Sequence, residues 1–332
     1  MERGMVRMPD SPAPLVSVVM PTYNHAAFIR ESLESVRAQT MPSWEAIVVN
    51  NFSEDDTVEI VNGLGDPRIR LVNYHNNGII GASRNQGMRL AKGRFLAFLD
   101  SDDIWLPGKL ARQLDELQAH PDDDWCYSDA ECFDSRSGAA LEKFSELYAS
   151  LPQGWVGSSL LQEGNFIASP TVLARRDVVV AAGGFNESPL VRCREDWELW
   201  LRLAACHRIA FVPEVLARYR EHPANVTRNE DLERVRKSNL QVIRNVVEAL
   251  PAVYAPIRGR AEALQYLNSG ASYAMRGEFG RARRLFARAI GKYPLFRHAW
   301  AWLFLSFLGK TGVALKERIF PLPRRVTTLA HR

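Results

Sequence analysis

Three carboxylates fall within four residues, at Asp100, Asp102 and Asp103, directly after the apolar run Phe95–Leu99. The end of a β-strand would hold these side chains close together, where like charges repel one another unless a cation is present. Such oxygen-rich clusters suit Mg²⁺ or Mn²⁺, which bind carboxylates and phosphate oxygens together. The spacing favours a divalent-metal site that handles a diphosphate. A solvated turn in which Asp103 caps the helix expected near Pro107 gives the same pattern.

A second acidic group, Glu195 and Asp196, precedes a segment predicted to be helical from Trp197 to Ala205. The helix dipole favours carboxylates at this position, so capping alone accounts for them. A carboxylate fixed at a helix start is also well placed to take a proton from a hydroxyl group. The two roles can coexist.

The elements that position these residues follow from the apolar pattern, in which short apolar runs alternate with amphipathic segments. This pattern predicts an α/β fold with a mostly parallel central sheet flanked by helices. The expected strands are Val16–Met20, Ala46–Val49, Ile69–Val72, Phe95–Leu99, Pro170–Ala174 and Ile209–Val212. The expected helices are Ala27–Ala38, Thr57–Leu64, Ala82–Ala91 and Pro107–Ala119, with Pro107 in a first turn. Because ligands bind at the carboxyl ends of strands in such sheets, the polar residues there are the ones to examine.

The chain of 332 residues divides by composition. Alternating strands and helices are expected from residue 16, and beyond about Thr227 the pattern is helical only. We therefore expect a catalytic domain (16–228), preceded by a flexible N-terminus (1–15) and followed by an α-helical C-terminal extension (229–332). From Pro251 onward there are 15 Lys/Arg against 3 Asp/Glu, a net +12, while the remainder carries 27 against 35, a net −8. Within the extension, Leu267, Gly270 and Tyr273 lead a pattern similar to one tetratricopeptide unit. It predicts either a helical hairpin packed on the main domain or a repeat-type binding surface.

The cysteines and the apolar stretches indicate a cytoplasmic protein. The four cysteines fit neither a paired zinc pattern nor a disulfide framework, so we expect reduced thiols. We expect no signal peptide in Met1–Leu15. The best apolar stretch, Ala299–Leu308, is half the length that spans a bilayer, although contact with a membrane surface remains open.

Six segments in order resemble the family 2 inverting glycosyltransferases of GT-A fold. They extend from about Val16 to about Arg228 and read VSVVMPTYN, VVNNFSEDDT, GASRNQGMRLAKGRFLAFLDSDD, SPTVLARR with GGFNES, EDWELWLRLA and ARYREH. The resemblance implies a Rossmann-like GT-A domain that moves a sugar from a nucleotide-diphosphate sugar, with a UDP-sugar favoured, to a sugar or lipid-linked acceptor. It also implies Mn²⁺ or Mg²⁺ as cofactor and a place in cell-surface polysaccharide or glycolipid synthesis.

The resemblance implies a role for each matching residue on the donor side. Asp102 corresponds to the metal ligand of a DxD motif, and His222 would complete the metal shell or donate to phosphate. The remaining donor-binding positions are Pro21, Thr22, Tyr23, Asn51, Ser53, Arg84, Asp100, Asp103 and Arg220. The sequence departs from the family at Asn50 and Asn51, which replace an acidic pair, and at Phe52, which replaces glycine. Base selectivity is therefore open. Asp55 keeps the family's later aspartate position, where we favour capping of the helix that begins near Thr57.

On the acceptor side, Asp196 corresponds to the general base of a single-displacement transfer, which inverts the anomeric carbon. Glu195 and Trp197 are expected to shape the acceptor pocket. Two other functions stay open: a catalytically silent nucleotide-sugar binder or scaffold that acts through the helical tail, and, more weakly, an oxidoreductase or methyltransferase. The last class would need a glycine-rich turn after Met20, which the sequence lacks.

The tail combines cationic residues with the aromatic run Ala299–Leu308, as in helices that lie on an anionic membrane surface. The alternative is that the aromatic side chains pack on the catalytic domain while the arginines stay in solvent. No nucleic-acid recognition motif accompanies the charge, so we expect no nucleic-acid partner.

Overall fold

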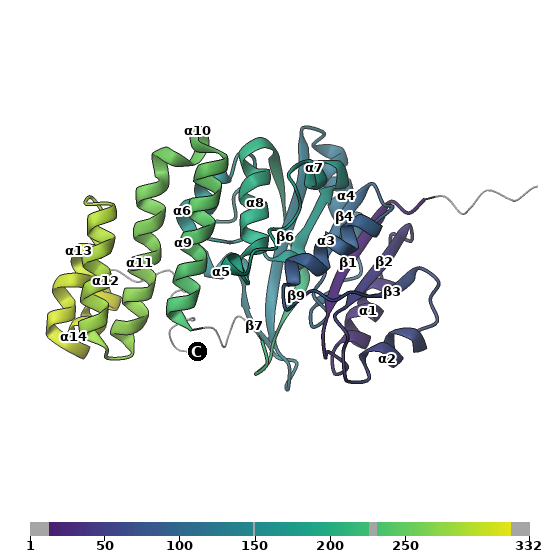
Figure 1. Cartoon of the computed structure of the whole chain (residues 1–332), viewed down its shortest axis with the longest axis horizontal. Coiled ribbons are helices and arrows are strands. Elements are labelled where there is room, and N and C mark those ends of the chain that lie inside the picture. The colour runs from purple at the N-terminus through teal and green to yellow at the C-terminus, as the bar shows by residue number, and fades with distance from the viewer. Residues whose placement is uncertain (1–12, 149, 226–230, 320–332) are drawn as a thin grey trace, which may run out of the picture.

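A computed structural model describes residues 13–148, 150–225 and 231–319. It consists of one mixed β-sheet flanked by helices, followed by a region made of helices alone (Figure 1). Most of the predicted flexible N-terminus (residues 1–12), the predicted domain boundary at 228/229 and the last part of the extension (residues 320–332) lie outside the described residues.

The sheet runs in the order β3-β2-β1-β4-β8-β6-β9-β5, with β7 paired to β6. Its first half is parallel and comprises β1 (Val16–Thr22), β2 (Trp44–Asn50), β3 (Ile69–Asn73) and β4 (Phe95–Phe98). Its second half comprises β5 (Ile104–Trp105), β6 (Asp123–Asp134), β7 (Ala140–Lys143), β8 (Val172–Arg175) and β9 (Arg208–Glu221). There only the β6/β9 pairing is parallel. The predicted α/β fold class is confirmed, with a parallel first half and a mixed second half.

Helices cover both faces of the sheet because the parallel strands are apolar on both faces. One face packs against α1 (Ile29–Arg37), α2 (Thr57–Gly63) and α4 (Lys109–Ala119). The other packs against α3 (Ile80–Leu90), α6 (Gly157–Glu163), α7 (Arg176–Ala181) and α8 (Glu195–Cys206). The alternation is clear on β1, where Val18 belongs to the first core and Val19 to the second.

The expected strands and helices are present, and two local predictions are wrong. Pro107 does not occupy a first helical turn, because α4 begins at Lys109, whose N–H is bonded to the carbonyl of Leu106 in a turn. The strand expected from Pro170 begins at Val172, after a 3₁₀ turn (Ser169–Thr171). The sequence analysis also missed β6, and it predicted only the first part of β9. Polar residues interrupt the apolar pattern of both strands.

The helices after residue 231 join two different cores. Helices α9 (Leu232–Ala249) and α10 (Pro251–Tyr254) belong to the core of the sheet, and the Tyr254 hydroxyl donates to the carbonyl of Leu201 at 2.6 Å. A separate core joins α11 (Arg258–Met275), α12 (Phe279–Lys292) and α13 (Arg297–Leu305), which α14 (Gly309–Ile319) follows. Among the described helices, none is both long enough and apolar enough to cross a membrane.

The pattern that resembled a tetratricopeptide unit forms the α11/α12 hairpin. A Cβ atom on Gly270 would lie 2.6 Å from the Phe286 ring, so the glycine permits the two helices to approach closely. This hairpin lies at the end of the molecule farthest from β3 (Figure 1).

Candidate active site

The predicted site residues come from the carboxyl ends of neighbouring strands. Strands β2, β1 and β4 are adjacent and parallel, so the segments that follow them begin at one edge of the sheet. The start of α8 reaches the same edge, as its contact with Arg84 shows.

Asp102 lies beside His222, because β9 runs back past the acidic loop. Ile104 of β5 pairs with Arg218 of β9, so the end of β9 lies next to Asp100–Asp103. The Asp102 Oδ2 atom is 3.1 Å from His222 Nε2. The predicted metal ligands therefore lie together, although they are 120 positions apart in sequence.

This pair fits a divalent cation in both chemistry and spacing. Burial acts to raise the pKa of Asp102, but the hydrogen bond with His222 and the nearby His25 outweigh it and lower that pKa, which favours the carboxylate form. Two ligands bound at right angles, each about 2.1 Å from an ion, lie about 3.0 Å apart. No cluster of three such ligands occurs among the described residues. Any further ligands would therefore come from phosphate oxygens and water, which Mg²⁺ commonly retains.

Arg220 holds the acidic loop in place. Its backbone N–H donates to the Asp103 carboxylate at 2.9 Å, and its Nε donates to the carbonyl of Asp102 at 2.6 Å. One terminal nitrogen pairs with Glu31 of α1 at 2.5 Å, and the guanidinium lies over Phe28. The structure thus places Arg220 beneath the loop, with its hydrogen bonds directed to protein groups.

Asp103 is almost fully buried, with 1% of its surface exposed. Burial and the neighbouring Asp102 raise the pKa of its carboxyl group. The Ser32 hydroxyl donates to its carbonyl at 2.6 Å. These contacts bind Asp103 to β9 and α1, so it does not cap α4 and does not face the open side of the loop.

Arg84 of α3 connects the two acidic groups. One terminal nitrogen donates to Asp100 at 2.7 Å and the other to Glu195 at 2.6 Å. The guanidinium is buried, which acts to lower its pKa, but the charges of Asp100 and Glu195 more than compensate and raise it. Arg84 therefore stays charged and fixes the end of β4 relative to the start of α8.

Asp196 lies next to this bridge and keeps hydrogen-bonding capacity. Its Oδ2 accepts from Asn165 at 3.2 Å and from Ser169 at 3.3 Å, both long contacts, while Oδ1 accepts the Trp197 N–H at 2.6 Å. Burial raises the pKa of Asp196, although the positive charge of Arg84 opposes the rise. A carboxylate with a raised pKa is a stronger base than an exposed one.

The other predicted acceptor residues are less accessible. Trp197 is buried in the core, where its indole N–H donates to the carbonyl of Leu160 at 3.0 Å. Glu195 is buried and paired with Arg84, and burial raises its pKa. Both side chains therefore point into the protein from the first turn of α8, and their contacts fix the orientation of that turn and of Asp196 between them.

The loops after β1 and β2 form a connected polar surface. Tyr23 is 48% exposed, whereas Pro21 and Thr22 are buried at the end of β1. Asn51 accepts the N–H of Asn76 at 3.0 Å. Ser53 accepts the N–H of Asn24 at 2.9 Å. Of the predicted nucleoside contacts, only the Tyr23 ring extends freely from this surface.

The asparagine that replaces the first acidic residue has a structural role. Asn50 is buried, donates to Asn73 at 2.8 Å and accepts from the Ser53 hydroxyl at 2.6 Å. Asp55 is not the N-cap residue of α2, which is Asp56, but its carboxylate accepts the N–H of Thr57, the first residue of that helix, at 3.1 Å. It also accepts the N–H of Ala26 at 2.9 Å, which joins the two loops.

Sequence reasoning missed His25, which lies at the centre of the site. Its Nδ1 atom is 2.7 Å from the Ser101 hydroxyl, and its ring lies 6.2 Å from that of His222. The only sequence signal was its position directly after the polar residues that end β1.

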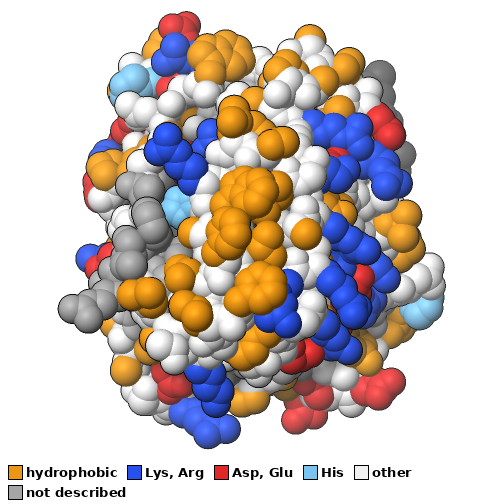
Figure 2. Space-filling view, turned by 90° about the vertical axis from the view of Figure 1, so that its left-hand side faces the viewer, with side chains coloured by type: hydrophobic (Ala, Val, Ile, Leu, Met, Phe, Trp, Pro, Cys, Tyr) orange, Lys and Arg blue, Asp and Glu red, His pale blue; other side chains and the backbone are white. Residues whose placement is uncertain are grey.

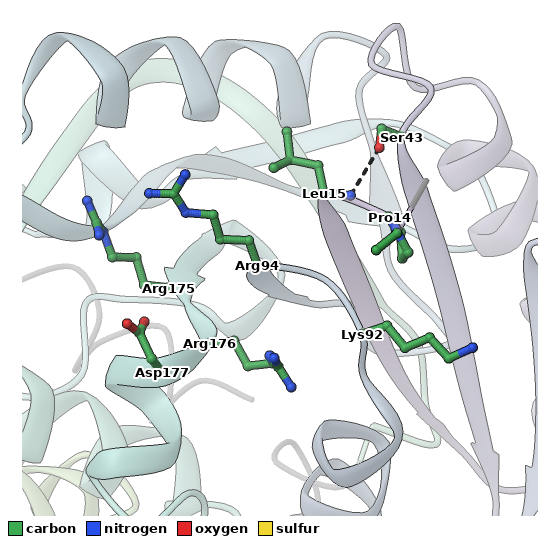
Figure 3. Close-up of a pocket in the computed structure, with 9 residues that line it drawn as sticks. Pro14, Leu15, Ser43, Lys92, Arg94, Arg175, Arg176 and Asp177 are labelled. Carbon is green, nitrogen blue, oxygen red and sulfur yellow. Dashed lines mark hydrogen bonds between the residues drawn. The ribbon is translucent and has the colours of Figure 1, made fainter. Parts of the chain in front are cut away.

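A different cleft, of about 690 Å³, lies at the opposite end of β1 (Figure 3). Arg175, Arg176, Lys92 and Arg94 line it together with Asp177. Leu15, just before β1, donates its N–H to Ser43 there at 3.0 Å. Arg94 of this cleft precedes β4 and Asp100 of the acidic loop follows it, six positions further along an extended chain, which is a length of about 20 Å. It is therefore not part of the candidate site.

The chain is similar to several known proteins over most of its length. Residues 17–177 match the profile of Glycosyl transferase family 2. The chain is 30% identical over 231 residues to UDP-Glc:alpha-D-GlcNAc-diphosphoundecaprenol beta-1,3-glucosyltransferase WfaP of Escherichia coli, covering 68% of this chain and 85% of that protein. It is 31% identical over 221 residues to an uncharacterized glycosyltransferase of Rickettsia prowazekii. That match covers 65% of this chain and just under two thirds (66%) of the relative.

Solved structures show the same fold. TarS of S. aureus in complex with UDP matches with a TM-score of 0.60 and 18% identity, over 91% of both chains. Mannosyltransferase PcManGT of Pyrobaculum calidifontis, in complex with GDP-Man and Mn²⁺, matches with a TM-score of 0.62 and 20% identity. That match covers 96% of this chain and 86% of the other. The predicted GT-A fold is therefore confirmed.

Proposed function

The chain belongs to glycosyl transferase family 2, and from this we propose that it transfers a sugar, with inversion, from a nucleotide-diphosphate sugar to an acceptor hydroxyl. The observation that carries the proposal is the Arg84 bridge, which fixes the acidic loop and the start of α8 next to each other. Donor binding and proton removal can then occur at adjacent places.

On the donor side, Tyr23 stacks on the base, and the loops of Asn51 and Ser53 contact the nucleoside. We favour a UDP-sugar, in line with the UDP bound by the similar TarS structure. Asp100 contacts the ribose or the sugar from its place beside Arg84. Asp103 and Arg220 hold the loop in the shape that Asp102 needs.

Asp102 and His222 are the residues that would hold Mn²⁺ or Mg²⁺. When bound, the ion supplies positive charge to the leaving diphosphate. The protein contributes the Asp102 carboxylate, and the hydrogen bond with His222 and the nearby His25 lower the pKa of Asp102 despite its burial, which keeps this carboxylate ionised.

On the acceptor side, Asp196 takes the proton from the acceptor hydroxyl as that oxygen attacks the anomeric carbon. The bond to the diphosphate breaks on the opposite face, and the configuration inverts. The raised pKa of Asp196 strengthens it as a base. Glu195 and Trp197 position it from behind.

We propose a sugar or lipid-linked acceptor and a role in cell-surface polysaccharide or glycolipid synthesis at the cytoplasmic side of a membrane. The name of the WfaP relative, which describes a diphosphoundecaprenol-linked acceptor, supports this. A catalytically silent nucleotide-sugar binder remains the second candidate, because amides replace the acidic pair at Asn50 and Asn51.

The test separates binding from transfer. Two quantities are measured for the parent, Asp102→Ala and Asp196→Asn. The first is thermal stabilisation by UDP-, GDP-, CMP- and dTDP-sugars in the presence of Mn²⁺, and the second is the slow hydrolysis of the donor. We expect Asp102→Ala to lose metal-dependent donor binding. Asp196→Asn should keep donor binding and lose at least about 10²-fold in donor hydrolysis, in which water takes the place of the acceptor hydroxyl and needs the same general base.

Asp177→Asn, an exposed carboxylate outside the site, is the control and should behave as the parent does. The mechanism is wrong if neither site substitution changes either signal. Donor binding without any turnover in the parent would favour the silent binder.

A further inference from the structure

Helix α13 has an inward face and an outward face. Ala299 and Trp302 are buried, whereas Trp300 and Phe304 are 40% and 63% exposed. Phe307, in the 3₁₀ turn η5 (Ser306–Leu308) that follows, is 67% exposed. The exposed positions 300, 304 and 307 have helical spacing and therefore lie on one side.

These side chains form a continuous apolar area. The rings of Trp300 and Phe304 stack with centroids 5.9 Å apart. Leu308, beside Phe307, is also largely exposed. We call Trp300, Phe304, Phe307 and Leu308 the aromatic face. Contiguous aromatic surface of this kind is uncommon on a protein that has no partner there.

The aromatic face lies among cations. From Phe279 to Leu315 the sequence has seven Lys or Arg residues and no Asp or Glu. Figure 2 shows apolar side chains at the centre of this end of the molecule, with Lys and Arg side chains on both sides. The Arg283 guanidinium lies 4.7 Å from the centre of the Phe307 ring, so charge and apolar surface are in direct contact.

Several of these cations are available to a ligand. Arg284 and Arg288 are exposed on the outer side of α12, and neither makes an ion pair within the described residues. Arg297 and Lys310 are exposed as well. A partner of this surface must therefore be anionic and must also accept aromatic side chains.

A second copy of the chain does not fit, because symmetric self-association would bring the exposed Arg284, Arg288 and Lys310 of two copies together, and these cations have no acidic partner among the described residues. A nucleic acid would satisfy the cations, but it offers no apolar phase for Phe304 and Leu308. An anionic lipid bilayer satisfies both requirements, since aromatic rings favour its interface and lysine and arginine bind its headgroups.

We propose that the aromatic face and the cations around it form a docking surface for an anionic membrane. The rings enter the headgroup region, and Arg284, Arg288 and Lys310 contact lipid phosphates. Because α13 is only nine residues long, it lies on the bilayer and does not cross it. This surface works independently of the proposed sugar transfer.

The experiment uses the full chain and vesicles of phosphatidylcholine, either alone or mixed with phosphatidylglycerol. Co-sedimentation is measured for the parent, for the triple variant Trp300→Ser/Phe304→Ser/Phe307→Ser, and for Arg284→Glu/Arg288→Glu. We expect the parent to bind only the mixed vesicles. Each variant should bind at least about tenfold more weakly, because the cations supply the attraction to anionic headgroups and the rings supply the apolar contact.

Two matched controls carry the same changes elsewhere. Trp155→Ser/Val180→Ser/Leu190→Ser removes three exposed apolar side chains, and Arg70→Glu/Arg244→Glu reverses two exposed cations. Both should bind as the parent does. Melting curves and donor hydrolysis without vesicles should match the parent for every variant, so that a loss of binding is not a loss of folding or of catalysis.

Several results would overturn the proposal. One is equal binding of parent and triple variant to mixed vesicles, and another is equal binding of the parent to neutral vesicles. A third is a parent dimer in sedimentation that the triple variant abolishes, which would make the face a protein interface. A fourth is binding that disappears on deletion of residues 320–332 and persists in the triple variant.

Discussion

Arg84 shows how one side chain can join two halves of an active site. Its planar guanidinium offers several N–H groups in fixed directions, so it can hold Asp100 and Glu195 at the same time. Asp100 lies in the loop after β4, whereas Glu195 is the first residue of α8. The distance between donor and acceptor groups therefore depends on this residue.

Arg84→Lys tests this dependence, because lysine keeps the charge but cannot bridge two carboxylates in the same geometry. We expect the transfer rate to fall about 10²-fold, the cost of a misplacement of about 1 Å. Steady-state kinetics measure it. Arg89→Lys, an exposed site on the same helix, is the control. A rate for Arg84→Lys equal to that of the parent would show that the bridge is not required.

The pKa of Asp196 predicts an acid limb in the pH profile. Burial raises this pKa above the ordinary value of 3.8, and a general base works only when deprotonated. Transfer should therefore decline as the pH falls through the raised pKa, at a higher pH than an exposed aspartate would give. Since Arg84 lowers the pKa of Asp196, Arg84→Ala should move the acid limb to still higher pH. The pH dependence of kcat/KM measures this, and an unmoved limb would contradict the assignment.

At the scale of elements, strand β9 completes the site and α4 supports it from one side. The pairing of β5 with β9 sets the position of Arg220 and His222. Beneath β5, α4 carries a fully buried lysine, Lys109, whose Nζ contacts Gln113 at 2.6 Å and lies 4.2 Å from the Trp105 ring. The elements that hold the acidic loop thus enclose an ionisable amine.

Lys109 predicts a pH-dependent stability. Burial lowers the pKa of its amine from 10.5 to about 7. Between these two pKa values the unfolded chain binds more protons than the folded one, so the free energy of unfolding should rise with pH across this window. This gain in stability is lost again as the pH falls to about 7. Between pH 7 and pH 9 the gain should be roughly 2 kcal/mol.

Denaturant unfolding at several pH values measures this gain. Lys109→Met removes the titrating group, so its stability should lack the rise. Lys92→Met, an exposed lysine, is the control and should keep it. The same slope in Lys109→Met and in the parent would assign the effect to another group.

At the scale of the whole molecule, the helical extension has two parts, of which the first, α9 and α10, packs into the core of the sheet, and the second carries the proposed docking surface. Val242, Ile243 and Val246 of α9, with Tyr254 of α10, lie in the same core as Trp200 of α8. The predicted domain boundary at 228/229 stays a prediction. The first helices after it, α9 and α10, complete the core that lies between the sheet and α8.

A chain that ends at residue 228 should therefore not fold. Four lost side chains of this size contribute about 1.5–3 kcal/mol each, which is comparable with the total stability of about 5–15 kcal/mol. Soluble expression and thermal melting measure the effect. The full chain is the reference for both measurements. A folded, soluble 1–228 fragment would mean that α9 and α10 are dispensable.

The sequence alone determined the alternation of strands and helices, the family resemblance and the position of the acidic loop after an apolar run. Apolar periodicity and local residue type are properties of neighbouring residues, so they can be read directly from the chain. The same holds for the aromatic run Ala299–Leu308, which the sequence identified without showing which side chains face outward.

Only the tertiary structure decided which side chains meet. Arg84 and Glu195 are 111 positions apart, and Asp102 and His222 are 120 apart. Their contacts depend on sheet order and on the β5/β9 pairing, neither of which local pattern specifies. The structure likewise placed Trp197 in the core and Trp300 at the surface, because packing against other elements decides which side of a helix is covered.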